Sequence, residues 1–109
     1  MAVDIKKMFN EDLPGQLSRN ADEAKAIGAK FQINITGEGE WNIDASASGP
    51  SCKPGTDAAD CTITIAGEDF QKLMENPQAN GMSLFFSGKL KVTGNNMLAM
   101  KLQKLFGFK

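Results

Sequence analysis

The sequence predicts one α+β domain, with a mainly antiparallel sheet of roughly five strands covered on one face by four to five short helices. Several stretches alternate apolar and polar residues, which is the period of a strand buried on one face. Other stretches carry apolar residues at i, i+3 and i+4, the spacing of a one-sided helix. The 109 residues are 41% hydrophobic and 23% charged, enough for a single core, so residues 1–109 are treated as one domain.

The first thirty residues predict two helices. Apolar residues at helical spacing predict a short helix over residues 2–10, and the run Leu13-Pro14-Gly15 is expected to end it. A second short helix is expected over residues 21–27, with Gly28 as its terminator.

The middle of the chain predicts strands. Residues 30–36 and 41–48 alternate around a Gly37-Glu38-Gly39 turn, which predicts a hairpin with one apolar and one polar face. Residues 49–56 hold two prolines and two glycines, which favours a loop around a short edge strand. Residues 61–65 predict another one-faced strand. The polar face of the resulting sheet is expected to meet water.

The last third predicts helices on both sides of a strand. Apolar triplets at helical spacing predict short helices ending near Met74 and Phe86, and residues 89–93 alternate as a strand. A final helix then runs toward the C-terminus. Its main apolar stripe, about 100° wide, consists of Leu98, Leu102, Leu105 and Phe106.

The final helix is also apolar in a second direction. Met97 and Met100 fall outside the main stripe, with Gln103 beyond Met100 on the same side. Two interpretations remain open. The methionines either fill irregular gaps in a core or sit exposed, or the helix covers a core with one face and lines a ligand cavity with the other.

The composition argues against several kinds of protein. There is no His and no Tyr, which removes the commonest general base and metal ligand and argues against a small α+β enzyme. No phosphate-binding or nucleophile motif is present, so neither a metal nor a cofactor is expected. Cys52 and Cys61 could pair, but without a secretory signal we expect two free thiols, with Cys61 buried. No stretch is long and apolar enough to span a membrane.

The charges are unevenly distributed. All thirteen acidic residues lie within residues 1–75, whereas residues 76–109 hold five lysines and no acid. This pattern fits an ordinary solvated basic face, or a surface that attracts anionic headgroups or acidic ligands. Five lysines without a basic-aromatic motif are too few to indicate nucleic-acid binding.

The region from Asp60 to Leu105 resembles the sterol carrier protein-2 family, also called non-specific lipid-transfer proteins. The most specific segment is Phe85-Phe86-Ser87-Gly88-Lys89-Leu90-Lys91-Val92-Thr93-Gly94-Asn95, followed by Met97-Leu98-Ala99-Met100-Lys101-Leu102-Gln103. Trp41 with Ile43-Asp44 looks like the tryptophan-containing second strand of that family. The resemblance covers about residues 30–105, and the first 28 residues match only in outline.

The resemblance implies an apolar tunnel between sheet and helices that holds fatty acids, fatty acyl-CoAs, phospholipids or sterols. It implies non-catalytic lipid binding and intermembrane transfer, with transient contact at a membrane surface, and we expect a monomer. The lipid-binding candidates are Trp41, Phe70, Phe85, Phe86, Met97, Met100 and Gln103. The candidates for headgroup or membrane contact are Lys89, Lys91, Lys101 and Lys104.

The chain departs from the family pattern in three places. The connection from Met74 to Phe85 differs in length, and the N-terminal helix looks short. The chain ends Phe106-Gly107-Phe108-Lys109 and not in a Ser-Lys-Leu-like peroxisomal address, so a cytoplasmic location is expected. The alternative function is a protein-interaction module of the same fold, with a filled core and a basic C-terminal docking face.

Overall fold

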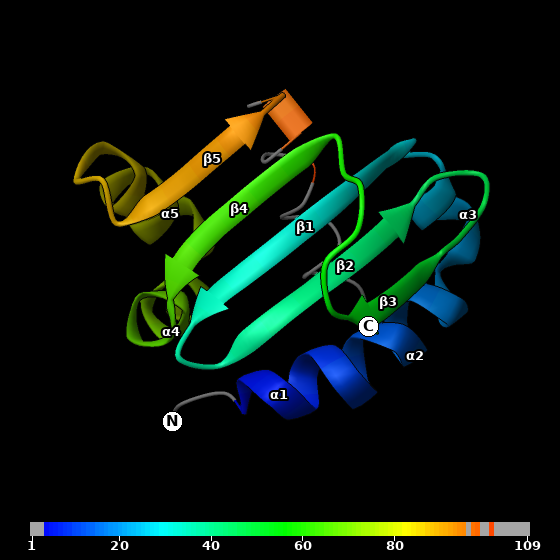
Figure 1. The fold of residues 1–109 in the computed structure, drawn as a ribbon, viewed down its shortest axis with the longest axis horizontal. Coiled ribbons are helices and arrows are strands. Elements are labelled where there is room, and N and C mark those ends of the chain that lie inside the picture. Colours follow the sequence, from blue (N-terminus) through cyan, green and yellow to red (C-terminus); the bar gives the residue numbers. More distant parts are fainter. Residues whose placement is uncertain (1–3, 96, 99–100, 102–109) are drawn as a thin grey trace.

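A five-stranded sheet forms the centre of the molecule (Figure 1). The computed structural model describes residues 4–95, 97, 98 and 101. The strand order is β3-β2-β1-β4-β5, with β1 parallel to β4 and the other neighbours antiparallel. The strands are β1 (Ala29–Thr36), β2 (Gly39–Ala45), β3 (Ser51–Pro54), β4 (Cys61–Ala66) and β5 (Leu90–Gly94). The predicted fold class, an α+β domain with a mainly antiparallel sheet, is confirmed.

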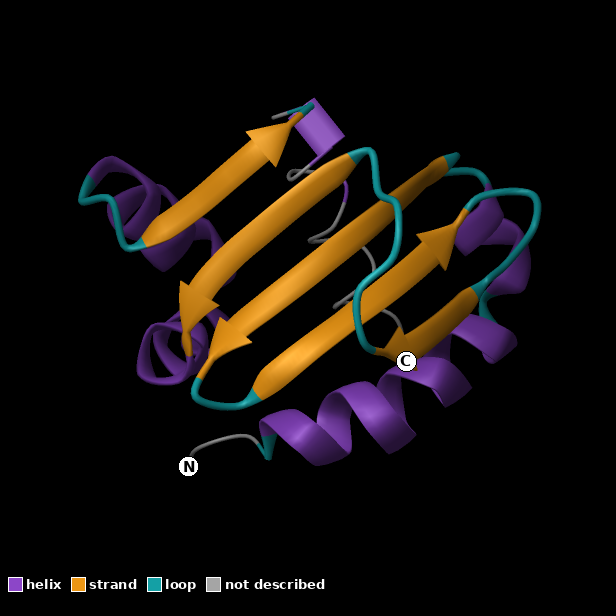
Figure 2. Ribbon diagram, in the orientation of Figure 1, coloured by secondary structure: helices purple, strands orange, loops and turns teal. Residues whose placement is uncertain are grey.

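The helices gather on one face of this sheet, behind it in the view of Figure 2. They are α1 (Ile5–Lys7), the π-helix η1 (Met8–Asp12), α2 (Leu13–Arg19), α3 (Ala21–Lys25), α4 (Gly67–Glu75) and α5 (Pro77–Phe86). The first four lie toward β2 and β3, and α4 and α5 lie toward β4 and β5. In the described part of the chain, none of the helices is long and apolar enough to cross a bilayer.

The alternating residues of the strands form the core. Ile33 of β1 lies opposite Trp41 of β2 and beside Ile63 of β4, so the apolar positions of neighbouring strands form continuous rows. These side chains point toward the helices, where they are buried. The period-two pattern therefore fixes the face of the sheet on which the core forms, since a slip of one residue would expose the whole set.

Pro14 does not end the N-terminal helix, so the expectation of a break there is wrong. The chain widens into a π turn just before the proline, where the Leu13 N–H donates to the Met8 carbonyl five residues back. Proline has no N–H, and its ring clashes with the carbonyl four residues back in a regular helix. A π turn is wider than a regular helical turn and gives the ring room, and α2 continues to Arg19.

The polar face of the sheet is not simply open to water, which corrects a second expectation. Residues 55–60, which join β3 to β4, cross in front of β2 and β1 (Figure 2). Gln32 lies beneath them and is only 1% exposed. Its side-chain amide donates to the Gly55 carbonyl at 3.1 Å and accepts from the Asp57 N–H at 3.1 Å. The Asn42 amide donates to the Gln32 amide oxygen at 3.1 Å, which completes a polar network beneath the crossing.

A short helical segment follows β5. Met97, Leu98 and Lys101 are helical, which agrees with the predicted final helix as far as the structure describes it. Asn95 begins this segment, since its side-chain oxygen accepts from the Met97 N–H at 3.1 Å, as a helix N-cap does.

Candidate lipid-binding site

The predicted lipid-binding residues fall into two groups in the structure. Trp41 and Phe70 are buried in the core, whereas Phe85, Phe86 and Met97 are exposed. The first pair belongs to the interior between β2, the N-terminal helices and α4, and the other three lie at the two ends of β5. Met100, Gln103 and Lys104 lie outside the described residues.

Phe9 joins the two buried aromatics into one cluster. Its ring stacks on Trp41 with centroids 4.7 Å apart and an interplanar angle of 16°, and it meets Phe70 at 5.6 Å and 47°. The Trp41 indole N–H donates to the Asn10 side-chain oxygen at 2.9 Å. Helical spacing predicted Phe9 as an apolar residue of the first helix. It could not predict that Phe9 stacks on Trp41, because these two residues are 32 positions apart in the sequence.

The π turn also positions a thiol. The Phe9 carbonyl receives no bond from the Leu13 N–H, which reaches Met8, and none from Pro14, which has no N–H. The Cys52 Sγ of β3 donates to this carbonyl at 3.3 Å. Burial raises the pKa of the Cys52 thiol to about 12, so it is protonated and unreactive near neutral pH.

The two cysteines are free, as expected, and Cys61 is buried. Cys52 aligns with Ile43, Ile43 with Phe31, and Phe31 with Cys61. This row places the thiols three strand spacings apart, about 14 Å, well beyond the roughly 7 Å limit between Cα atoms of a disulfide. Burial, followed by the charge of Asp60, raises the pKa of Cys61 as well.

The apolar face is less completely covered at β5. Leu90 pairs with Ile65 and Val92 with Ile63, so the four side chains share the face that carries the helices. The two residues on β4 are buried, but the two on β5 are only half-buried. Leu98, at the start of the final helical segment, packs against this same core and is also half-buried. The apolar face of β5 is thus less completely buried than that of its neighbour β4.

Three of the candidate lysines are described, and they lie before, within and after β5. Lys89 precedes β5, Lys91 lies within it and Lys101 belongs to the final helical segment, and all three are exposed. In the described part of the chain, the structure records an ion pair between Lys7 and Asp12 and none for these three lysines. Their charges are therefore available to an anionic ligand or surface.

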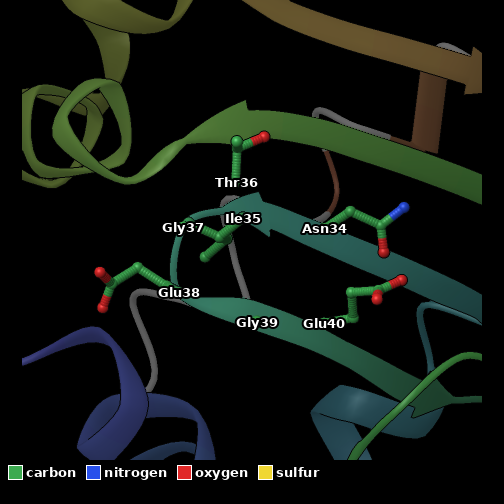
Figure 3. A pocket seen from close by; sticks show the side chains of 7 residues that line it. All are labelled: Asn34, Ile35, Thr36, Gly37, Glu38, Gly39 and Glu40. Carbon is green, nitrogen blue, oxygen red and sulfur yellow. The ribbon is translucent and has the colours of Figure 1, made fainter.

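A hollow of about 440 Å³ lies at the β1–β2 turn, away from these residues (Figure 3). Its lining consists of Asn34, Ile35, Thr36, Gly37, Glu38, Gly39 and Glu40. Two carboxylates and two other polar side chains make this lining unsuited to an apolar ligand, and Glu38 and Glu40 extend to opposite sides of the turn. No group of three or more potential metal ligands occurs among the residues that the structure describes.

The sheet, its one-sided helices and the tryptophan on β2 agree with a known family. The family model described as the SCP-2 sterol transfer family matches residues 9–107. The chain belongs to this family. The resemblance inferred over about residues 30–105 is thereby confirmed, and the SCP-2 match extends further, to residue 9 within the N-terminal helices, where the sequence resembled the family only in outline.

Curated SCP-2 relatives are much longer than this chain. Human sterol carrier protein 2 is 45% identical over 87 residues, which cover 74% of this chain and 16% of that protein. Bovine hydroxysteroid dehydrogenase-like protein 2 is 37% identical over 92 residues, covering 81% of this chain and 22% of that protein. The chain thus spans about a sixth of the first relative's length and about a fifth of the second's.

Solved SCP-2 structures share the fold. The sterol carrier protein domain 2 of Helicoverpa armigera superposes with a TM-score of 0.67 at 28% identity, covering 91% of this chain and 84% of that one. Sterol carrier protein 2 of Aedes aegypti, solved as a complex with the C16 fatty acid palmitate, gives a TM-score of 0.69 at 18% identity over the whole of both chains.

Proposed function

We propose that this domain binds a lipid in an apolar cavity and carries it between membranes without catalysing a reaction. The ligand class is a fatty acid, fatty acyl-CoA, phospholipid or sterol. The observation that carries the proposal is the match to a sterol transfer family over residues 9–107. The Aedes aegypti protein of the same fold, which was solved with palmitate, supports a long acyl chain as one ligand.

The cavity is proposed to lie against the β4–β5 part of the sheet. Ile63 and Ile65 form its floor, and the half-buried Leu90 and Val92 extend this floor to the edge strand. An apolar ligand would complete the burial of the β5 side chains. Burying apolar surface of this kind contributes about 25 cal/mol per Å².

The final helix is proposed to cover this floor. Met97, Met100 and Gln103 lie off its main apolar stripe in the sequence and would face the lipid. Unbranched methionine side chains adapt to ligands of different shape, which suits a carrier with little selectivity. The aromatic cluster of Phe9, Trp41 and Phe70 is proposed to close the inner end of the cavity, where its rings are already packed against one another.

The energetics favour transport over storage. A 16-carbon chain gains about 13 kcal/mol on leaving water, at ~0.8 kcal/mol per methylene. A bilayer offers nearly the same gain, so transfer from a membrane to the cavity is close to neutral. The domain would therefore lower the cost of crossing water and release its ligand readily at the next membrane.

Titration with a fluorescent long-chain fatty acid tests the proposal. We expect micromolar or tighter binding, weakened by Met100→Glu because a carboxylate in an apolar cavity loses its hydration. Ser83→Glu is the matched control, since Ser83 is exposed on α5 and outside the proposed cavity. Circular dichroism checks that both variants fold. No binding of any lipid class by the wild type would contradict the proposal.

The competing function is a protein-interaction module with a filled core. The stacked aromatic cluster, each member at most 3% exposed, favours it for the N-terminal part of the core. A lipid-free protein that takes up no fatty acid, yet binds a protein partner through its exposed lysines, would establish this alternative.

A further inference from the structure

Two adjacent phenylalanines lie on the surface at the end of α5. Phe86 is 76% exposed and Phe85 44%, and their rings meet edge to face at 5.9 Å. Phenylalanine is usually buried, and two exposed rings side by side form an apolar patch that a lone exposed side chain does not. Such patches mark surfaces that meet a partner or a membrane.

The backbone holds this pair in a fixed position. After Phe86 the Lys89 N–H donates to the Leu84 carbonyl at 2.9 Å, and the Gly88 N–H donates to the Phe85 carbonyl at 3.2 Å. These two bonds form a Schellman motif, in which glycine takes a positive φ, here +78° at Gly88. The Ser87 hydroxyl adds a bond to the Leu84 carbonyl at 3.1 Å. Leu84 is itself buried, so the motif is anchored in the core and the two rings project from it.

The charges beside the pair are positive. Lys89 follows the Schellman glycine directly, and Lys91 lies two residues further on β5. α5 itself has no charged residue, and the only charged residue of β5 is a lysine. The exposed acidic residues Glu68 and Glu75 belong to α4, the helix that packs on α5. Aromatic side chains flanked by lysines suit the boundary of a bilayer that contains anionic lipids.

We propose that the end of α5 docks this domain on anionic membranes. The Phe85 and Phe86 rings enter the interfacial layer of the bilayer, and Lys89 and Lys91 contact anionic lipid headgroups. This inference rests on the proposed function and assigns the two phenylalanines a role outside the cavity. The turn leads directly into β5, so docking brings the half-buried Leu90 and Val92 next to the bilayer from which the lipid is taken.

Vesicle flotation tests the docking element. The wild-type protein should float with phosphatidylcholine–phosphatidylserine vesicles and much less with phosphatidylcholine alone. The double variant Phe85→Ser, Phe86→Ser should bind the mixed vesicles about tenfold more weakly or worse, because it loses apolar surface that enters the bilayer. The substitution Phe86→Trp provides a second readout. Its indole emission should shift to shorter wavelength on mixed vesicles, while the buried Trp41 stays unchanged.

A matched pair of charge variants separates docking from general attraction. Lys89→Gln, Lys91→Gln should weaken binding to the mixed vesicles severalfold at low salt. Lys25→Gln, Lys53→Gln removes the same charge from α3 and β3, where both lysines are exposed, and should change binding little. Equal losses from the two pairs would contradict a localised docking site.

Fatty-acid titration without vesicles distinguishes this inference from the proposed function. Retained fatty-acid affinity in the double phenylalanine variant, together with lost vesicle binding, supports docking. Loss of both in a folded variant would place the rings in the cavity and overturn it. A wild type that dimerises through this patch, with the double variant monomeric in sedimentation velocity, would overturn it in favour of a self-interface. If the wild type binds no fatty acid but docks through the two rings, the proposed function fails and the docking element stands.

Discussion

Aromatic residues are buried at one end of the helix layer and exposed at the other. Toward β2 and β3, Phe9 is fully buried and stacked on Trp41, which is hydrogen-bonded to Asn10. Toward β5, Phe85 and Phe86 meet each other at the surface. Both ends are built from short helices, so the difference lies in what each helix covers. The first end closes the core, and the second leaves apolar side chains exposed.

The difference suggests a division of roles in this fold: the buried aromatic cluster stabilises the core, and the exposed phenylalanine pair does not. Buried aromatic contacts raise the free energy of unfolding, whereas exposed phenylalanines add little to it and lower solubility. Retaining an exposed pair is reasonable where another surface covers it during function. Four predictions test this division, beginning with the largest expected effect.

Phe9→Ala should destabilise the fold by about 3–5 kcal/mol, because it removes a buried ring and leaves a cavity between Trp41 and Phe70. Phe86→Ala should change the free energy of unfolding by about 0.5 kcal/mol or less. Urea unfolding followed by circular dichroism measures both. Similar losses at the two positions would break the comparison.

Gly94→Ala should cost about 2–4 kcal/mol, since it combines strain with a steric clash. Gly94 has φ +86°, and a Cβ there would lie 2.5 Å from the Asp60 carbonyl oxygen. Gly88→Ala is the matched variant, with φ +78° and nothing within 4 Å of the added carbon, and should cost about 1 kcal/mol. A larger loss of stability for Gly94→Ala than for Gly88→Ala would show that the β5 backbone is fixed although its side chains are incompletely buried. A harmless Gly94→Ala would mean that β5 shifts freely.

Asn10→Ala should destabilise by about 1–3 kcal/mol, because the buried Trp41 indole N–H loses its acceptor. Asn10→Asp keeps an acceptor oxygen at the same place and should retain most of the stability. As Trp41 is the sole tryptophan, its emission reports unfolding and local hydration in both variants. Identical effects of alanine and aspartate would rule out the hydrogen bond as the cause.

Raising the pH should lower the free energy of unfolding through the Cys52 thiol, which lies on β3 and contacts the N-terminal helices. Its thiol has a pKa of about 12 in the folded protein, against an ordinary value of 9.0. Between these values the unfolded chain loses the proton first, so the free energy of unfolding falls as pH rises. The Cys52 thiol alone should lower the free energy of unfolding by about 1 kcal/mol by pH 10.

The variant Cys52→Ala isolates this contribution. Its unfolding free energy should decline less steeply above pH 9 than that of the wild type, because the other titrating groups are common to both. Parallel curves would show that the thiol titrates equally in the folded and unfolded chains.

Much of the fold was predictable from local patterns. Period-two alternation located β1, β2, β4 and β5, and the short helix expected before Gly28 corresponds to α3. Pro14 misled the prediction because proline was judged against a regular α-helix, and nothing local indicates the π turn that admits it. The crossing over Gln32 was missed for another reason. It depends on a connection more than twenty residues later in the chain, which period-two alternation cannot report.

The candidate site was less predictable than the fold. Trp41 and Phe70 belong to one cluster only through Phe9, a contact between distant segments. Phe85 and Phe86 read as apolar helix residues, but the sequence could not show that the helix ends with both rings facing outward. The roles of Met97, Met100 and Gln103 stay predictions.

Native mass spectrometry of the purified protein tests the central claim most directly. We predict the polypeptide mass plus one lipid, lost on delipidation and restored by adding a long-chain fatty acid. A spectrum of the bare polypeptide that stays unchanged after fatty acid, acyl-CoA, phospholipid and sterol are added would contradict the account and favour a filled core.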